Sequence, residues 1–216
     1  MLELLARIIP LDFAASISPV VFALVLLLLG GKSPLKRTFW FLIGALVVGI
    51  TVTLLGLTLG HVVTGKFGQT DFSSAIDIFI GGLLVALAFW TLLVKKKKHH
   101  LASTSEKSSL WRWLALGIVT GIFNWNGVFL NFVAAREVGV AEVGEIEKIA
   151  VLIINLLFYA LPILLPLLLY LIFPGTAMRF LTKINYLMTK YSKYVVFILL
   201  IIVAIIIIDH GLRYLI

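Results

Sequence analysis

Two asparagines interrupt a strongly apolar stretch of the sequence. Asn124 and Asn126 lie in GIFNWNGVFL (121–130), and the helix breaker Gly127 follows them. Inside a bilayer, only protein groups, a water-filled cavity or a ligand can satisfy such amides. These residues are therefore candidates for substrate binding. The alternative is that the amides only join neighbouring helices, at about 0.6 kcal/mol per hydrogen bond.

An earlier apolar stretch, SISPVVFALVLLLLGG (16–31), carries a similar interruption at Ser16, Ser18 and Pro19. Pro19 has no N–H, so a helix running through it would leave one backbone carbonyl without its usual partner. A shift of 108 residues places this stretch on residues 124–139, where polar residues and a helix breaker recur. We expect the two broken helices to meet at mid-membrane and to form one polar site.

Asp12 lies one helical turn before Ser16, and two interpretations of it stay open. Pro10 suits the first position of a helix, which would put Asp12 in the first turn, where the helix dipole stabilises an anion. Alternatively, the carboxylate binds a proton or a cation that is coupled to transport. Asp77 and Asp209 fall near the ends of apolar stretches and are expected at the membrane interface.

A later apolar stretch carries Asn155, a further candidate for substrate binding, followed by Pro162 and Pro166. The two prolines are four residues apart and share one helix face, where they either form a hinge or only pack. Glycines recur along two other stretches, and close helix packing is their expected role. They are Gly44, Gly49, Gly56, Gly60, Gly117 and Gly121.

No pattern in the sequence predicts an enzyme, a cofactor or a metal site. The chain has no cysteine, which excludes disulfides and thiolate ligands. His99 and His100 follow Lys95–Lys98 without further ligands at the spacing of a metal site. There is no phosphate-binding glycine loop and no nucleophile elbow. An intramembrane lipid-modifying enzyme would have only the scattered Asp12, His61 and His210 to use.

The composition is that of a polytopic membrane protein. Of 216 residues, 62% are hydrophobic and 13% are charged, and the mean hydropathy is +1.14. Soluble domains have about 45–50% apolar and about 25% charged residues. The net charge of +8 comes from basic residues between apolar stretches. Anionic lipid headgroups are therefore the expected partners, above all at Lys95–Lys98, and nucleic acid is not.

Six stretches are long enough to cross a bilayer, at about 20 apolar residues each. They are residues 10–29, 38–61, 75–94, 111–135, 149–173 and 194–212. If both termini are outside, 13 of the 18 lysines and arginines fall on the inner side, and of the ten acids only Glu106 does. This asymmetry is typical of a correct topology. The expected location is a prokaryotic cytoplasmic (inner) membrane.

The basic segment 95–109 divides the chain into two halves, residues 1–94 and 110–216, with three expected spans each. An odd number of spans turns the second half over in the membrane, as in many secondary transporters. The predicted fold class is an all-α polytopic membrane protein with six transmembrane helices in two inverted three-helix repeats.

The order of these features resembles a known family. SPVVFALVLLLLGGKSPLKRTFWFLIGALVVGITVTLLGLTLG (18–60) is similar to the opening repeat of the LysE exporter superfamily, and within it to the glycolipid-addressing, GAP or Sap-like, proteins. NWNG (124–127) falls where that group has a break resembling Asn-Pro-Lys-Asn, with Trp125 and Asn126 in place of Pro and Lys. LPILLPLLLYLIFP (161–174) is similar to its proline-bearing fifth span. The resemblance implies an exporter of glycolipids or lipid-like molecules.

The sequence therefore predicts a transporter that moves a lipid-like or small amphiphilic substrate through a site at mid-membrane. Two alternatives stay open. One is an exporter of a small solute, an amino acid or an ion. The other is a non-transporting membrane partner or assembly protein. A homo-oligomer is compatible with either.

Overall fold

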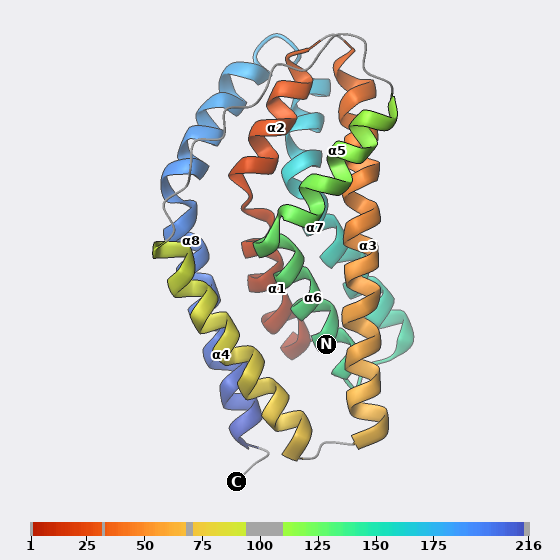
Figure 1. Ribbon diagram of the computed structural model, residues 1–216, viewed down its shortest axis with the longest axis vertical. Coiled ribbons are helices and arrows are strands. Elements are labelled where there is room, and N and C mark those ends of the chain that lie inside the picture. The colour runs from red at the N-terminus through yellow and green to blue at the C-terminus, as the bar shows by residue number, and fades with distance from the viewer. Residues whose placement is uncertain (1, 32, 68–70, 94–109, 214–216) are drawn as a thin grey trace.

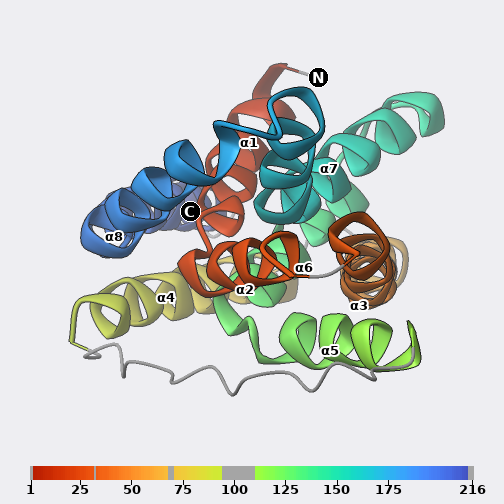
Figure 2. The same ribbon diagram turned by 90° about the horizontal axis from the view of Figure 1, so that it is seen from above.

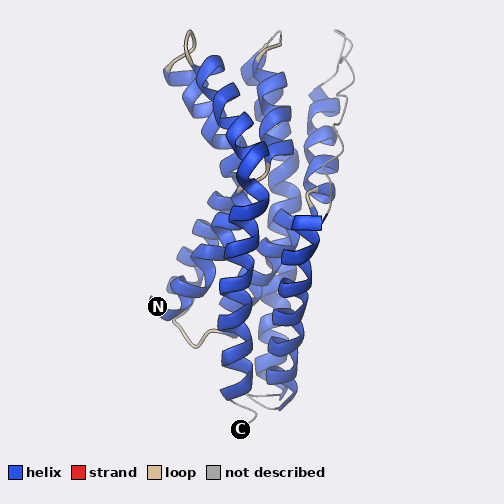
Figure 3. Ribbon diagram, turned by 90° about the vertical axis from the view of Figure 1, so that its left-hand side faces the viewer, coloured by secondary structure: helices blue, strands red, loops and turns tan. Residues whose placement is uncertain are grey.

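The computed structural model describes residues 2–31, 33–67, 71–93 and 110–213, and every regular element in these ranges is a helix (Figures 1 and 3). In chain order the helices are α1 (Leu2–Ser16), α2 (Pro19–Leu29), α3 (Pro34–Phe67), α4 (Asp71–Leu93), α5 (Leu110–Phe123), α6 (Trp125–Val140), α7 (Glu145–Ile172) and α8 (Ala177–Arg213). The all-α prediction is confirmed. The basic run Lys95–Lys98 lies outside the described residues, as does the rest of the expected linker.

Both predicted helix breaks are present. Helices α1 and α2 are bent by 51° at Ile17 and Ser18, and Pro19 is the first residue of α2. The chain turns through short hydrogen bonds, in which the Ser18 N–H donates to the Ser16 carbonyl at 3.1 Å. Helices α5 and α6 are bent by 73° at Asn124. Proline at the start of one helix and asparagine before the other are residues that suit helix N-termini.

The predicted count of six spans is not confirmed. Two helices are long and apolar enough to cross a membrane by themselves, Pro34–His61 within α3 and Glu145–Ile172. Three bent pairs, α1 with α2, α5 with α6 and the two parts of α8, raise the count among the described residues to five at most. The expected span 75–94 falls in α4, where the apolar helical stretch Ile78–Trp90 is shorter. A bent pair followed by two long helices occurs twice along the chain, but the inverted repeat stays a prediction.

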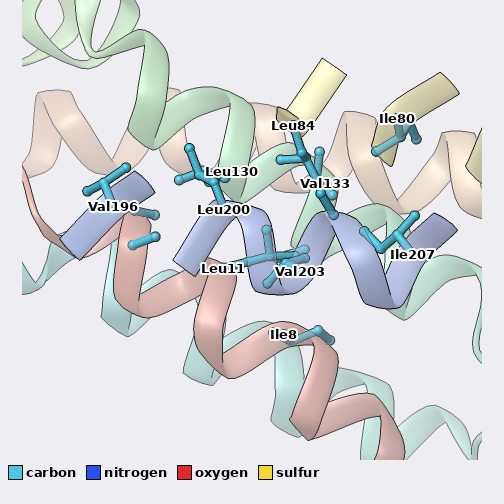
Figure 4. Close-up of a cluster of buried hydrophobic side chains, with 14 of the residues drawn as sticks. Ile8, Leu11, Ile80, Leu84, Leu130, Val133, Val196, Leu200, Val203 and Ile207 are labelled. Atoms are coloured by element: carbon cyan, nitrogen blue, oxygen red, sulfur yellow. The ribbon is translucent and has the colours of Figure 1, made fainter. Parts of the chain in front are cut away.

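The helices pack so that the two halves interleave. Helix α3 of the first half lies against α5 and α6, and α4 lies along α8 (Figures 1 and 2). Helix α1 packs on α6, α7 and α8. A cluster of buried aliphatic side chains from α1, α4, α6 and α8 fills the space between these helices, with Ile8, Leu84, Val133 and Leu200 among them (Figure 4). Burial of these side chains holds the two halves together.

A second buried cluster joins the opposite end of the molecule. It is built around Phe22, Phe41, Trp113 and Leu181, from α2, α3, α5 and α8. In Figure 1 this is the upper end, where α2 ends and α3, α5 and α8 begin. There the Arg37 guanidinium lies 5.0 Å from the centre of the Trp113 ring, a cation–π contact between α3 and α5.

Glycines allow backbones to touch where α3 crosses α5 and α6. A methyl group added at Gly44 would overlap the backbone of Leu114, and one at Gly117 would overlap the Phe41 carbonyl. Gly56 and Gly60 meet α6 in the same way. The predicted packing role of these glycines is confirmed.

The outer surface of the helices is apolar. Leucine, isoleucine, valine and phenylalanine side chains are exposed along α3, α7 and α8, including Leu54, Leu157 and Ile198 at 54%, 54% and 57%. Large exposed apolar faces of this kind are unfavourable in water and favourable in lipid. Together with the apolar helices, they identify an integral membrane protein.

Candidate functional site at the helix breaks

The structure brings the two helix breaks together. Ser18 Oγ, at the start of α2, donates to Asn124 Oδ1, at the start of α6, over 3.1 Å. Both residues occupy the N-cap position, where a side chain usually accepts from the N–H groups of its own helix, and neither does so here. The two caps are bonded to each other instead, so the N-termini of two half-helices lie at one junction.

The junction corrects the register of the proposed repeat. Helices α2 and α6 begin at Pro19 and Trp125, which are 106 residues apart rather than 108. Ser18 therefore corresponds to Asn124 and not to Asn126. Hydropathy alone did not fix this register, because a shift by two residues leaves the apolar pattern nearly unchanged.

The other residues predicted at the junction lie close to it in the chain. Ser16 is buried, and its hydroxyl donates to the Phe13 carbonyl of its own helix at 2.7 Å. Asn126 is half-buried in the first turn of α6. Gly127 is buried, and a methyl group there would overlap the Asn124 side-chain amide. Glycine at this position therefore leaves room for Asn124 to reach Ser18.

The break between α5 and α6 lies at the apolar surface. Phe123 and Trp125, which flank Asn124, are 69% and 68% exposed. In Figure 2, α5 lies along the edge of the molecule. The Asn124 side of the junction is thus at the apolar surface of the protein, whereas Ser18 is buried.

Four buried polar side chains form a hydrogen-bonded group between the junction and the start of α1. Asn155 Nδ2 donates to Asp12 Oδ1 at 2.6 Å, which joins α7 to α1. The hydroxyl of Thr53 on α3 lies 3.4 Å from Asn155 Oδ1 and 3.4 Å from Asn131 Oδ1, and Asn131 Nδ2 donates to Thr53 Oγ1 at 3.1 Å. Asn131 Nδ2 also lies 3.2 Å from the Gly49 carbonyl. All four side chains are buried, at 7% exposure or less.

Thr53 and Asn131 were not predicted. Asn131 lies seven residues after Asn124 and thus on the same face of α6, a spacing that could have identified it. Nothing in the sequence marks Thr53, since a threonine is common in a membrane helix, where it can bond the backbone of the preceding turn. Its position becomes meaningful only when α3, α6 and α7 are packed together.

Asp12 is not in the first turn of a helix. Helix α1 begins at Leu2 and continues through Pro10, so Asp12 lies in its interior and is 1% exposed. The explanation by the helix dipole is therefore wrong. Pro10 was expected to start the helix, but a membrane helix tolerates a proline in its interior when neighbouring groups satisfy the freed carbonyl. The alternative role in ion or proton coupling stays a prediction.

Charged side chains are buried near the end of α6. Arg136 and Glu137 are 0% and 6% exposed, and Arg136 Nη1 donates to Glu137 Oε1 at 2.8 Å. Arg7 on α1 lies 3.7 Å from Glu137 Oε2 and 2.7 Å from Glu3. Lys148 at the start of α7 is also buried and lies 3.6 Å from Glu145. Arg136 lies in the last turns of α6 and Lys148 in the first turn of α7, on either side of the loop that joins the two helices.

The buried polar side chains are thus confined to one part of the molecule. From the junction they continue along α1, α3, α6 and α7 to the end where α1 begins. Of the buried polar residues in the described ranges, only Thr38 lies on the other side of the junction. We call this set of buried polar side chains the polar path; it runs from the junction toward the start of α1, which is marked N in the lower half of Figure 1.

The prolines of α7 lie within an unbroken helix. Pro162 and Pro166 are both buried, and α7 is one continuous helix from Glu145 to Ile172. Their role as a hinge stays a prediction. Among the described residues, no three histidine, cysteine or acidic side chains come together to hold a metal ion.

Comparison with known families gives a match over most of the chain. The family described as Sap, sulfolipid-1-addressing protein, matches residues 8–213. The chain belongs to this family. The Sap-like resemblance is thereby confirmed, while membership of the wider LysE superfamily stays a prediction. The searches of curated proteins and of solved structures gave no match. Both helix breaks, the buried polar path and α7 lie within the part that matches the Sap family.

Proposed function

We propose that this protein is a transporter that moves a lipid-like or small amphiphilic molecule across the membrane, with the junction of the two broken helices as its binding site. The observation that carries the proposal is the Ser18–Asn124 hydrogen bond between two helix starts. The N-terminus of a helix has backbone N–H groups without helical partners and attracts negative or polar groups. Two such ends at one place can hold the polar head of a substrate within the bilayer.

The position of the junction favours an amphiphile. Because Phe123 and Trp125 face outward beside Asn124, a lipid can present its head group to the junction from the side while its chains stay in the bilayer. A small polar solute would instead need an enclosed, water-filled path. The apolar flanks therefore support a lipid-like substrate over an amino acid or an ion.

The buried polar path supports movement of the head group along α1, α6 and α7. Asn131 and Asn155 follow the junction, and Arg7 and Arg136 come next toward the end where α1 begins. In the proposed topology this end faces the outside of a bacterial inner membrane, and the two halves are inverted repeats. The protein then acts as an exporter without a catalytic residue or a cofactor.

The family description names a sulfolipid, and an acidic glycolipid is the substrate class that we propose for this chain. Trp125 and Asn126 stand where the resembling proteins have Pro and Lys. Amides, a hydroxyl and the helix N-termini would therefore receive the head group here, without a lysine at the break.

Transport in vesicles tests the proposal. The protein is reconstituted in phosphatidylethanolamine–phosphatidylglycerol vesicles with a fluorescent sulfated glycolipid, and movement between leaflets is followed by quenching from outside. We expect Ser18→Ala and Asn124→Ala to lower the rate about fivefold to tenfold, since one hydrogen bond to the head group contributes about 1–1.4 kcal/mol.

Thr51→Ala is the matched control. The Thr51 hydroxyl is exposed on α3 and donates to the Val47 carbonyl of its own helix at 2.8 Å. Its removal should leave the rate unchanged. Equal rates for the wild type and both junction variants would disprove the site. A wild-type rate equal to that of empty vesicles would instead favour a non-transporting membrane partner.

A further inference from the structure

The buried carboxyl of Asp12 accepts one hydrogen bond from the described part of the chain, although a carboxylate can accept several. Oδ1 accepts from Asn155 Nδ2, whereas Oδ2 is buried and has no hydrogen-bond partner among the described residues. No basic side chain there forms an ion pair with it. A charged carboxylate inside a membrane protein is costly unless it is paired or well hydrogen-bonded. One neutral amide does not supply this.

The neighbouring polar side chains also have fewer hydrogens to donate than they have acceptor oxygens to satisfy. The Thr53 hydroxyl lies within reach of both Asn155 Oδ1 and Asn131 Oδ1, but it has a single hydrogen to donate. In any one arrangement, an amide oxygen is therefore left without a donor from the described residues. Together with Asp12 Oδ2, this gives two buried acceptor oxygens without a hydrogen. A positive species, a proton or a metal cation, would correct the imbalance.

The orientation of Asn155 selects the proton. Its N–H group, and not its oxygen, faces the Asp12 carboxyl at 2.6 Å. A metal cation at this carboxyl would be repelled by that N–H, and it requires several oxygen ligands around it. A proton on Oδ2 removes the buried charge without a shell of oxygen ligands and leaves the bond from Asn155 to Oδ1 intact.

The other charged side chains of α1, α6 and α7 pair with groups other than the Asp12 carboxyl. On α1, Arg7 is held by Glu3 and Glu137. On α6, Arg136 is bonded to Glu137. On α7, Lys148 lies beside Glu145, and Tyr159 is one turn beyond Asn155. The buried side chains of α8, the third helix packed on α1, are all apolar in the described residues.

We infer that Asp12 is the site at which this protein binds and releases a proton during its transport cycle, with Asn155 positioning the carboxyl. This inference rests on the proposed function. The proton binds Oδ2 from water when the site is open and leaves from the same atom; no bond other than this O–H forms or breaks. In the arrangement that the structure describes, in which Asp12 is buried, Asp12 carries the proton.

The site is connected to the junction through α7. Tyr159 lies one turn after Asn155, and its ring fills the space beside Gly49 on α3. Its hydroxyl oxygen is 3.3 Å from the position that a methyl group would take at Gly121, three residues before Asn124. When Asp12 loses its proton, the charged carboxylate needs water or further donors, which separates α1 from α7. That movement reaches both breaks, because α1 ends at Ser16 and Tyr159 lies against α5.

Infrared spectroscopy tests the proton directly. The protein is reconstituted as above with ¹³C-labelled aspartate, and the C=O stretching band of a protonated carboxyl is recorded at neutral pH. We expect the band in the wild type and in Asp209→Asn, a control at an exposed aspartate, and its loss in Asp12→Asn. Absence of the band from the wild type, or its persistence in Asp12→Asn, would overturn the assignment.

Transport of the fluorescent sulfated glycolipid tests the coupling. If one proton is exchanged per lipid, a pH difference of about one unit supports up to about tenfold accumulation in one leaflet. The wild type and Asp209→Asn should show this accumulation, and Asp12→Asn should show none. A response of Asp12→Asn equal to that of the wild type would overturn the coupling. If the wild type moves no lipid while the infrared band depends on Asp12, the proposed function fails and the proton site stands.

Discussion

The close approach of α3 and α5 leads to a quantitative prediction for Gly44→Ala. The added methyl group would overlap the Leu114 carbonyl and lie 2.9 Å from the Ile118 amide nitrogen. Both neighbours are backbone atoms, so no side chain can rotate away and the helices must separate. Overpacking of this kind costs about 1–3 kcal/mol, and contact with rigid backbone favours the upper value.

Gly82→Ala isolates the packing cost. Gly82 is exposed on α4 with no atom within 4 Å of the added methyl group. Both substitutions gain the same helix propensity, about 1 kcal/mol, which cancels in the comparison. Gly44→Ala should therefore be about 3 kcal/mol less stable than Gly82→Ala. The free energies of unfolding are measured by titration with dodecyl sulfate in mixed micelles and followed by circular dichroism.

A double variant makes the test specific for the crossing. Gly117→Ala overlaps the Phe41 carbonyl in the same α3–α5 contact, so it should cost less in a protein that already carries Gly44→Ala. Equal stability of Gly44→Ala and Gly82→Ala would refute the backbone contact. Fully additive costs at Gly44 and Gly117 would show that the two glycines do not act on one contact.

Three further predictions concern buried polar groups and the junction. A double-mutant cycle with Asp12→Asn and Asn155→Ala should give a coupling energy of about 0.6–1.7 kcal/mol in the same unfolding assay, and a value near zero would argue against the bond. Glu137→Gln removes the carboxylate that pairs with buried Arg136 at 2.8 Å and should destabilise by about 3–5 kcal/mol, whereas joint replacement of Arg136 by Met and Glu137 by Leu should recover most of the loss. Gly127→Ala should displace the Asn124 amide and reduce glycolipid movement as much as Asn124→Ala does; an unchanged rate would show that Asn124 does not need this space.

The helix breaks could be predicted because their causes are local. Pro19 cannot continue a helix from the preceding turn, and a pair of asparagines before Gly127 favours a helix start. The glycine contacts could be predicted for a similar reason, since small residues at helical spacing serve few purposes in a membrane other than close packing.

The buried network could not be predicted because it depends on how four helices face one another. One of the two interpretations of Asp12 placed it in a first turn, from the helix-starting preference of Pro10, and tertiary packing overrode that preference. Thr53 gives no signal in a hydropathy pattern. The expected span in α4 is not confirmed, because its composition favours a span while its described apolar helix, Ile78–Trp90, is short.

The uneven distribution of buried polar groups bears on the direction of transport. Among the described residues, the buried polar side chains other than Thr38 lie between the Ser18–Asn124 junction and the end where α1 begins, and the cluster around Phe22, Phe41 and Leu181 fills the other side. Basic residues at the starts of α3, α5 and α8, including Arg37, lie at that apolar end, and such residues collect on the cytoplasmic side. In the proposed topology the polar path therefore leads outward, away from the cytoplasm. A substrate that enters from the inner leaflet would find successive hydrogen-bond partners toward the outside. Its return would be opposed by the apolar cluster on the cytoplasmic side. This asymmetry is what an exporter requires.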